Sequence, residues 1–98
     1  MKFLLVSSHA GGTEVPEGEK STHMKAFGEW LQMMNPSVAL PVHGGVSVTS
    51  QTAVEYSGGL AGALIFEADS LEEAVEKTKK SPGLKYGWTH DVLKEAPL

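Results

Sequence analysis

Short apolar runs separated by polar loops predict four main strands. KFLLVS (2–7) and LAGALIFEA (60–68) are apolar on both faces, which is typical of buried strands. SVALPVH (37–43) is also extended, but Pro41 cannot donate to a ladder, so this strand is expected at a sheet edge or to break there. WTHDVLKE (88–95) alternates and forms the last predicted strand.

Helical spacing appears in two further segments. In 21–34 an amphipathic helix is predicted by one apolar stripe of Met24, Phe27, Leu31 and Met34. Asn35-Pro36 ends it, because proline disfavours helical geometry in the preceding residue. The second helix follows Ser70, whose hydroxyl can cap it while Glu73 reaches back to the Ser70 amide in a reciprocal capping box.

Between the predicted strands 37–43 and 60–68, the segments GVSVTS and TAVEYS lie around Ser50-Gln51. They predict a short hairpin or an extended excursion. The element order is therefore β-α-β-(hairpin)-β-α-β, the split βαβ arrangement of ferredoxin-like α+β domains. Two helices cover only one face of such an antiparallel sheet. If the other face met water, apolar and polar residues would alternate along 2–7 and 60–68, and they do not. We therefore expect that face to pack against a second copy of the chain, as an isologous homodimer.

Composition narrows the class of protein. Ninety-eight residues make one domain, 1–98, and the absence of cysteine excludes disulfides and thiolate metal sites. The net charge is −4 and no arginine is present, which argues against nucleic-acid binding. No apolar run approaches the ~20 residues of a membrane span. A cytoplasmic protein without membrane or nucleic-acid partners is expected.

Two histidines are candidates for acid/base chemistry. His23 lies beside the apolar stripe of the first helix, where an imidazole titrating near neutral pH can transfer protons. A half-exposed helix-entry histidine bonded to a loop explains the same position. His43 follows a strand end and precedes two glycines that let the backbone turn sharply. It forms a proton-transfer pair with His23, or it is a polar residue in a bend.

Candidate ligand contacts come from other elements. His9 follows the first strand, at a strand end where ligands are often bound. Phe27 and Trp88 supply rings for a flat apolar ligand, although core packing or a dimer contact explains most such rings more simply, without any ligand. His9 and His90 show no metal-ligand spacing, and the glycines after His9 lack the nucleotide-loop pattern. No metal or cofactor is expected.

Two segments carry a family resemblance. MKFLLVSSHAGG at the start, and a glycine-rich strand entry followed by ADSLEEAV and SPGLKYG within 59–87, resemble the YCII-related (YciI-like) family, most closely its small DGPF-type proteins. The resemblance implies a ferredoxin-like fold and dimerisation into an α+β barrel. It also implies a helix-borne histidine paired with an aspartate. His23 matches the histidine, whereas the aspartate position falls in PVHGG, which offers His43, and VEYSGG replaces the DGPF segment.

Two functions follow from these residues. The first is a small dimeric protein that binds a ring-bearing or acidic metabolite and acts as a cofactor-free lyase or isomerase, with His23 as general acid/base and His43 assisting. The second is a non-catalytic ligand-binding or accessory module.

Overall fold

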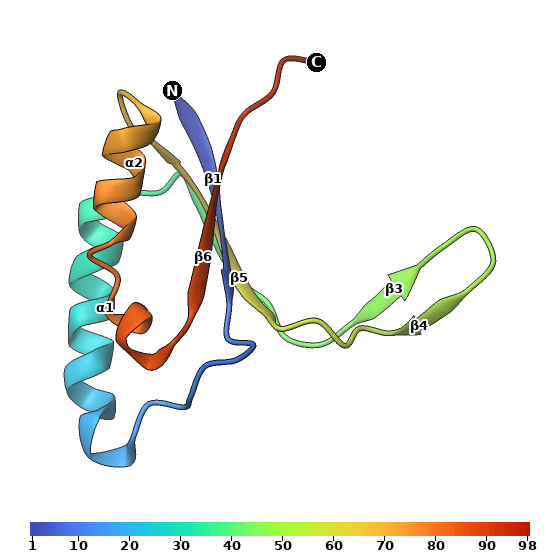
Figure 1. Cartoon of the computed structure of the whole chain (residues 1–98), viewed down its shortest axis with the longest axis horizontal. Helices are drawn as coiled ribbons and strands as arrows, with labels where there is room; N and C mark the ends of the chain where they lie inside the picture. The colour runs from blue at the N-terminus through green and yellow to red at the C-terminus, as the bar shows by residue number, and fades with distance from the viewer.

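The computed structural model describes residues 1–98 as one antiparallel sheet covered by two helices on one face, with a hairpin projecting from the other side (Figure 1). The strands are β1 (Lys2–Ser8), β2 (Val38–Pro41), β3 (Val46–Val48), β4 (Ala53–Glu55), β5 (Leu60–Glu67) and β6 (Thr89–Lys94). The helices are α1 (Lys20–Met34) and α2 (Leu71–Thr78), with 3-10 turns η1 (Glu17–Glu19) and η2 (Pro82–Tyr86). No helix combines the length and apolar content that crossing a bilayer requires.

The sheet has the strand order β2-β5-β1-β6, and every neighbouring pair is antiparallel. This is the ferredoxin-like arrangement predicted from the element order. β2 is an edge strand that ends at Pro41, as the missing amide of proline requires. β3 and β4 pair only with each other, which confirms the hairpin.

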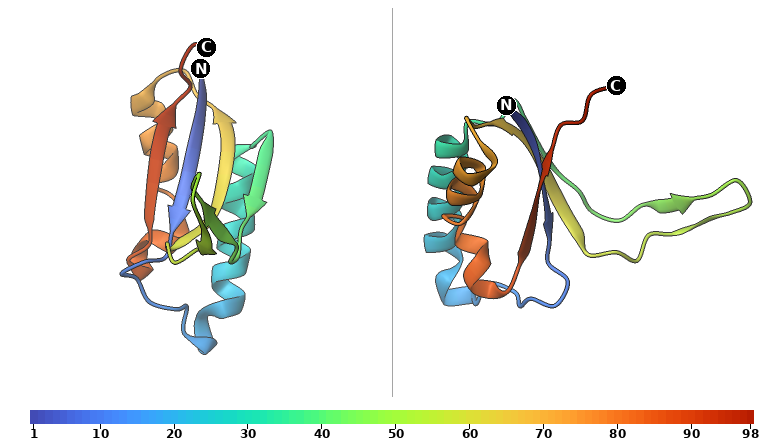
Figure 2. Two further views of the ribbon diagram at one scale, coloured as in Figure 1. Left: turned by 90° about the vertical axis from the view of Figure 1, so that its right-hand side faces the viewer. Right: turned by 45° about the horizontal axis from the view of Figure 1, so that its top comes forward.

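The core lies between the sheet and the helices. Phe3 and Leu5 of β1 point toward the helices and are completely buried beside Leu64 and Phe66 of β5. Fully burying such a side chain is worth roughly 1.5–3 kcal/mol. Alternate residues of the same strands point to the opposite face, which no element of the chain covers (Figure 2).

That open face is mostly apolar, with Asp91, the register partner of Val6, as a charged residue on it. Its exposed side chains include Leu4, Val38, Leu40 and Leu93. The strands β1 and β5 therefore carry apolar side chains on both faces, as their sequences predict. In a single chain, nothing covers the face that lies away from the helices.

The buried stripe of α1 differs from the predicted one. Met24 is 64% exposed, whereas His23, Trp30 and Met34 are buried. The stripe runs through His23, Phe27, Trp30 and Met34 because this rotation of the helix buries the indole, the largest side chain on it. The predicted stripe included Met24, which is exposed, and omitted Trp30, which is buried.

The N-terminus of α2 confirms half of the predicted capping box. The Glu73 amide donates to Ser70 Oγ at 3.1 Å. The Glu73 carboxylate does not reach back to Ser70; its Oε1 pairs with Lys77 Nζ at 3.2 Å, one helical turn later. An i,i+4 ion pair thus replaces the second hydrogen bond of the box.

Replacing Ser70 by alanine tests the cap. We expect Ser70→Ala to lower the free energy of unfolding by about 1 kcal/mol, because the first turn of α2 loses its side-chain acceptor. Urea titration followed by circular dichroism measures this change. Ser47→Ala in the exposed strand β3 is the matched control, and an equal loss in both variants would contradict the role of the cap.

Candidate functional site

A cavity of about 390 Å³ lies between α1 and the sheet. Its walls come from α1, the end of β1, β2, β5 and the start of β6, together with Ser81 before η2 and Trp88 after it. The lining is mostly apolar, and no carboxylate is part of it. The polar side chains that reach it are three histidines and two serines: His9, His23, His90, Ser7 and Ser81.

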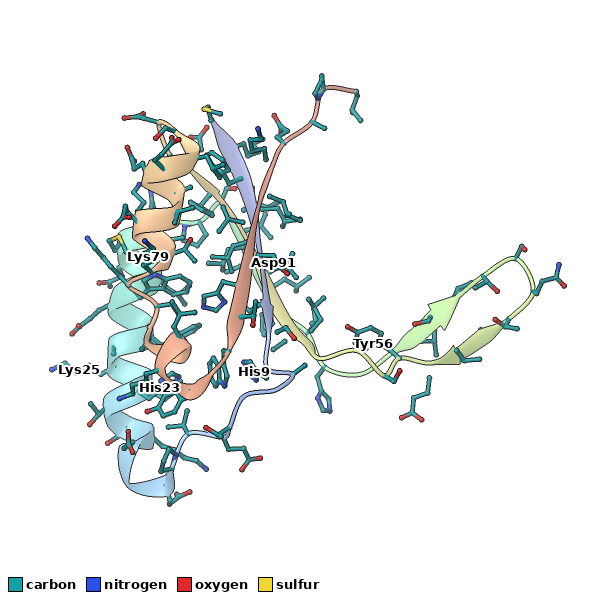
Figure 3. All side chains as sticks on the ribbon, in the orientation of Figure 1. His9, His23, Lys25, Tyr56, Lys79 and Asp91 are labelled. Carbon is teal, nitrogen blue, oxygen red and sulfur yellow. The ribbon has the colours of Figure 1, made fainter.

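Four of the five predicted site residues meet at this cavity. His9, His23, Phe27 and Trp88 all line it. His9 follows β1 and His23 belongs to α1 (both labelled in Figure 3), and the imidazoles of both residues line the cavity.

His43 is the exception. Its side chain is exposed and lies outside the cavity lining. β2 ends at Pro41, and Gly44 and Gly45 adopt φ values of +68° and +125° that turn the chain into the hairpin. The structure therefore does not bring His43 to His23, and the expected pair does not form within one chain.

Trp88 joins His9 to His23. The His9 ring stacks on Trp88 with 3.7 Å between ring centroids, and His23 meets the same indole edge-on at 5.4 Å. Trp88 Nε1 donates to the Thr13 carbonyl oxygen at 3.0 Å, which fixes the orientation of the indole. The three rings form a rigid aromatic corner of the cavity.

Two glycines make room for this indole. A Cβ at Gly83 would lie 2.2 Å from Trp88 Cε3, and a Cβ at Gly12 would lie 2.8 Å from Trp88 Cδ1. Neither position accepts a side chain without moving Trp88. The glycine-rich loop after β1 therefore serves to hold a cavity wall.

His23 is buried, with 8% of its surface exposed, so the interpretation as a half-exposed helix-entry residue is wrong. Its Nδ1 is buried and has no hydrogen-bond partner. Buried polar atoms without partners are uncommon because they cost free energy. Tyr86 packs edge-on against the imidazole at 5.4 Å, and the Tyr86 hydroxyl donates to Glu19 Oε1 at 3.0 Å. The ring of His23 is therefore held by aromatic packing.

Sequence reasoning missed His90 and the two serines beside it. His90 Nδ1 lies 2.8 Å from Ser7 Oγ, and His90 Nε2 lies 2.8 Å from Ser81 Oγ. The Trp30 ring stacks over His90 at 5.7 Å. A signal was present: Ser7 and His90 continue the inward-facing positions of β1 and β6, and the two are register partners.

Two of the cavity histidines, His9 and His90, have surroundings that favour the neutral imidazole. Burial lowers the pKa of His90, and the nearby His9 lowers it further. Burial also lowers the pKa of His9, with His23 adding to the effect. Neutral imidazoles at pH 7 can accept or relay protons. No group of three or more potential metal ligands is assembled anywhere in the chain.

Comparisons with known proteins locate the fold. No protein family and no curated protein matches the chain by sequence. Among solved structures, the 5-chloro-2-hydroxyhydroquinone dehydrochlorinase of Burkholderia phenoliruptrix, in complex with 2,5-dihydroxybenzoquinone, superimposes with a TM-score of 0.63 at 19% identity. The match covers 98% of this chain and 94% of that chain. The likeness shows a shared α+β ferredoxin-like fold, while membership of the YCII-related family stays a prediction.

The lowered pKa of His90 predicts acid sensitivity. The unfolded chain binds a proton on this histidine at higher pH than the folded chain does, so acidification below the ordinary histidine pKa of 6.5 favours unfolding. We expect the free energy of unfolding to fall between pH 7 and pH 5, and to fall less steeply in His90→Gln.

Chemical denaturation across this pH series measures both slopes. His43→Gln, at the exposed histidine outside the cavity, is the control and should keep the wild-type slope. A His90→Gln slope as steep as the wild-type slope would refute the assignment.

Proposed function

We propose that the chain binds a small ring-bearing metabolite in this cavity and moves a proton on it with His23, without a cofactor. The observation that carries the proposal is the convergence of imidazoles and aromatic rings on one apolar cavity. Its volume of about 390 Å³ lies within the range of small-molecule sites.

The walls suit a flat ring. Trp88 and Phe27 place aromatic rings along the cavity, and the small residues Gly62 and Ala63 of β5 leave room beside them. With few polar groups in the lining, hydrogen bonds to the histidines and serines would set the orientation of the ligand. Because no carboxylate lines the cavity, a neutral or anionic ring is favoured over a cation.

The chemistry follows from the available groups. In an elimination or an isomerisation, a base takes a proton from the substrate, a double bond forms or shifts, and the leaving group or a new C–H bond takes the displaced electrons. His23 would act as this base and His9 would assist in place of His43. The similar fold of a dehydrochlorinase, whose structure holds a hydroxylated quinone, supports the same class of ligand and reaction.

A non-catalytic binding module is the second candidate. Two observations favour it: His43 lies outside the cavity lining, and no carboxylate lines the cavity beside His23. His23 therefore lacks the carboxylate partner that the family resemblance implies. Binding and proton transfer must therefore be tested separately.

Binding is tested with 2,5-dihydroxybenzoquinone as the probe. We expect calorimetric binding to the wild-type protein and an affinity about tenfold lower in Trp88→Ala, because the variant loses the indole that lines the cavity and holds the His9 ring by stacking, and tenfold corresponds to about 1.4 kcal/mol. His43→Ala is the control outside the cavity. Equal affinity in all three proteins would exclude this cavity as the site.

Proton transfer is tested by exchange of the ring hydrogens of the same probe in deuterated water. The wild-type protein should accelerate the exchange, and His23→Asn should bind the probe but lose the acceleration. Binding without acceleration in the wild-type protein would select the non-catalytic module.

We further propose that two copies pack through their open sheet faces. Leu4 and Leu93 are register partners on this face and stay exposed in a single chain. Large apolar patches on a soluble protein mark interaction surfaces.

Light scattering should give about twice the chain mass of 10.4 kDa for the wild-type protein and a monomer for Leu93→Lys, because burying an ammonium group at an interface is costly. Gln32→Lys, on the exposed surface of α1, adds the same charge as a control. A wild-type monomer would refute the dimer.

A further inference from the structure

His90 bridges two hydroxyl groups on the cavity wall. It projects from β6, with Ser7 of the neighbouring strand β1 at Nδ1 and Ser81 of the loop before η2 at Nε2, both at 2.8 Å. Ser7, Ser81 and His90 all line the cavity. A neutral imidazole donates from one nitrogen and accepts at the other, so the chain Ser81–His90–Ser7 has a direction.

The direction is set at Ser81. This residue is only 6% exposed, and its Oγ accepts from the Gly83 amide at 3.3 Å as the cap of η2. The hydroxyl proton of Ser81 then has one acceptor within hydrogen-bond distance, Nε2 of His90. Because a buried donor without an acceptor costs free energy, Ser81 donates to His90.

The proton of His90 is then on the other nitrogen. With Nε2 accepting, Nδ1 carries the hydrogen and donates to Ser7 Oγ. Burial lowers the pKa of His90, which keeps this single-proton form at neutral pH. Ser7 Oγ thus receives a hydrogen bond from the protein, and no protein acceptor is assigned to its own proton.

We infer that Ser7 is a specificity-determining residue that donates its hydroxyl proton to an oxygen acceptor on the ligand, a ring carbonyl or a ring oxyanion. Ser81 and His90 are positioning residues that orient and polarise this donor, since hydrogen bonds in a chain strengthen one another. The inference rests on the proposed function and names its ligand class. The opposite tautomer of His90 would instead make Ser7 an acceptor for ligand hydroxyl groups.

The tautomer is directly measurable. In protein with ¹⁵N-labelled histidine, the ring nitrogen shifts of His90 should show the proton on Nδ1, and His90→Gln identifies the signal. A proton on Nε2 would overturn the inference, whether or not any ligand binds.

Binding tests the donor itself. Ser7→Ala should weaken 2,5-dihydroxybenzoquinone binding about tenfold, the value of one good hydrogen bond, and leave p-xylene affinity unchanged, because that ring has no oxygen. Ser7→Thr should restore affinity, and Ser8→Ala, on the neighbouring residue outside the cavity lining, should have no effect.

The outcomes separate the two proposals. If the wild-type protein binds both probes and Ser7→Ala affects neither or both equally, the donor role is wrong and the cavity remains a ring-binding site. If the wild-type protein binds neither probe, the proposed function and the ligand class fail together.

Discussion

The packing of Trp30 is the contact on which the rest of the structure depends. Its indole is buried between α1 and the sheet, and Nε1 donates to the Lys77 carbonyl oxygen in the last turn of α2 at 3.0 Å. The same ring stacks over His90 of β6. One side chain therefore sets the rotation of α1, its distance from α2 and one wall of the cavity.

The cavity separates stacking groups from hydrogen-bonding groups. Trp88, held in place by two glycines and a backbone carbonyl, stacks with His9 and meets His23 edge-on. His90 and its two serines supply directed polar contacts from the sheet side. This division suits the flat ring with a few oxygen atoms that we propose as the ligand.

The strands, the second helix and the hairpin were predictable because each depends on local signals, such as proline at an edge or serine at a cap. The rotation of α1 was not, because Met24 and Trp30 fit two helical stripes equally well and only packing chooses between them. Four residues that line the cavity were predicted as candidates from residue type and place in the chain. The Ser7–His90 pair needed the register of two strands, and the exclusion of His43 needed the direction in which two glycines turn the chain.

The projecting hairpin of β3 and β4 touches the body only through its two stems, and both of its outer edges are unpaired. A polypeptide cut at its tip, between Ser50 and Gln51, would leave β2 in one fragment and β5 in the other. Those fragments would still be joined by β5 lying between β1 and β2, and by the core beneath them. The tip is therefore the natural place to split the protein into two complementing halves, or to insert a reporter domain, without disturbing the cavity.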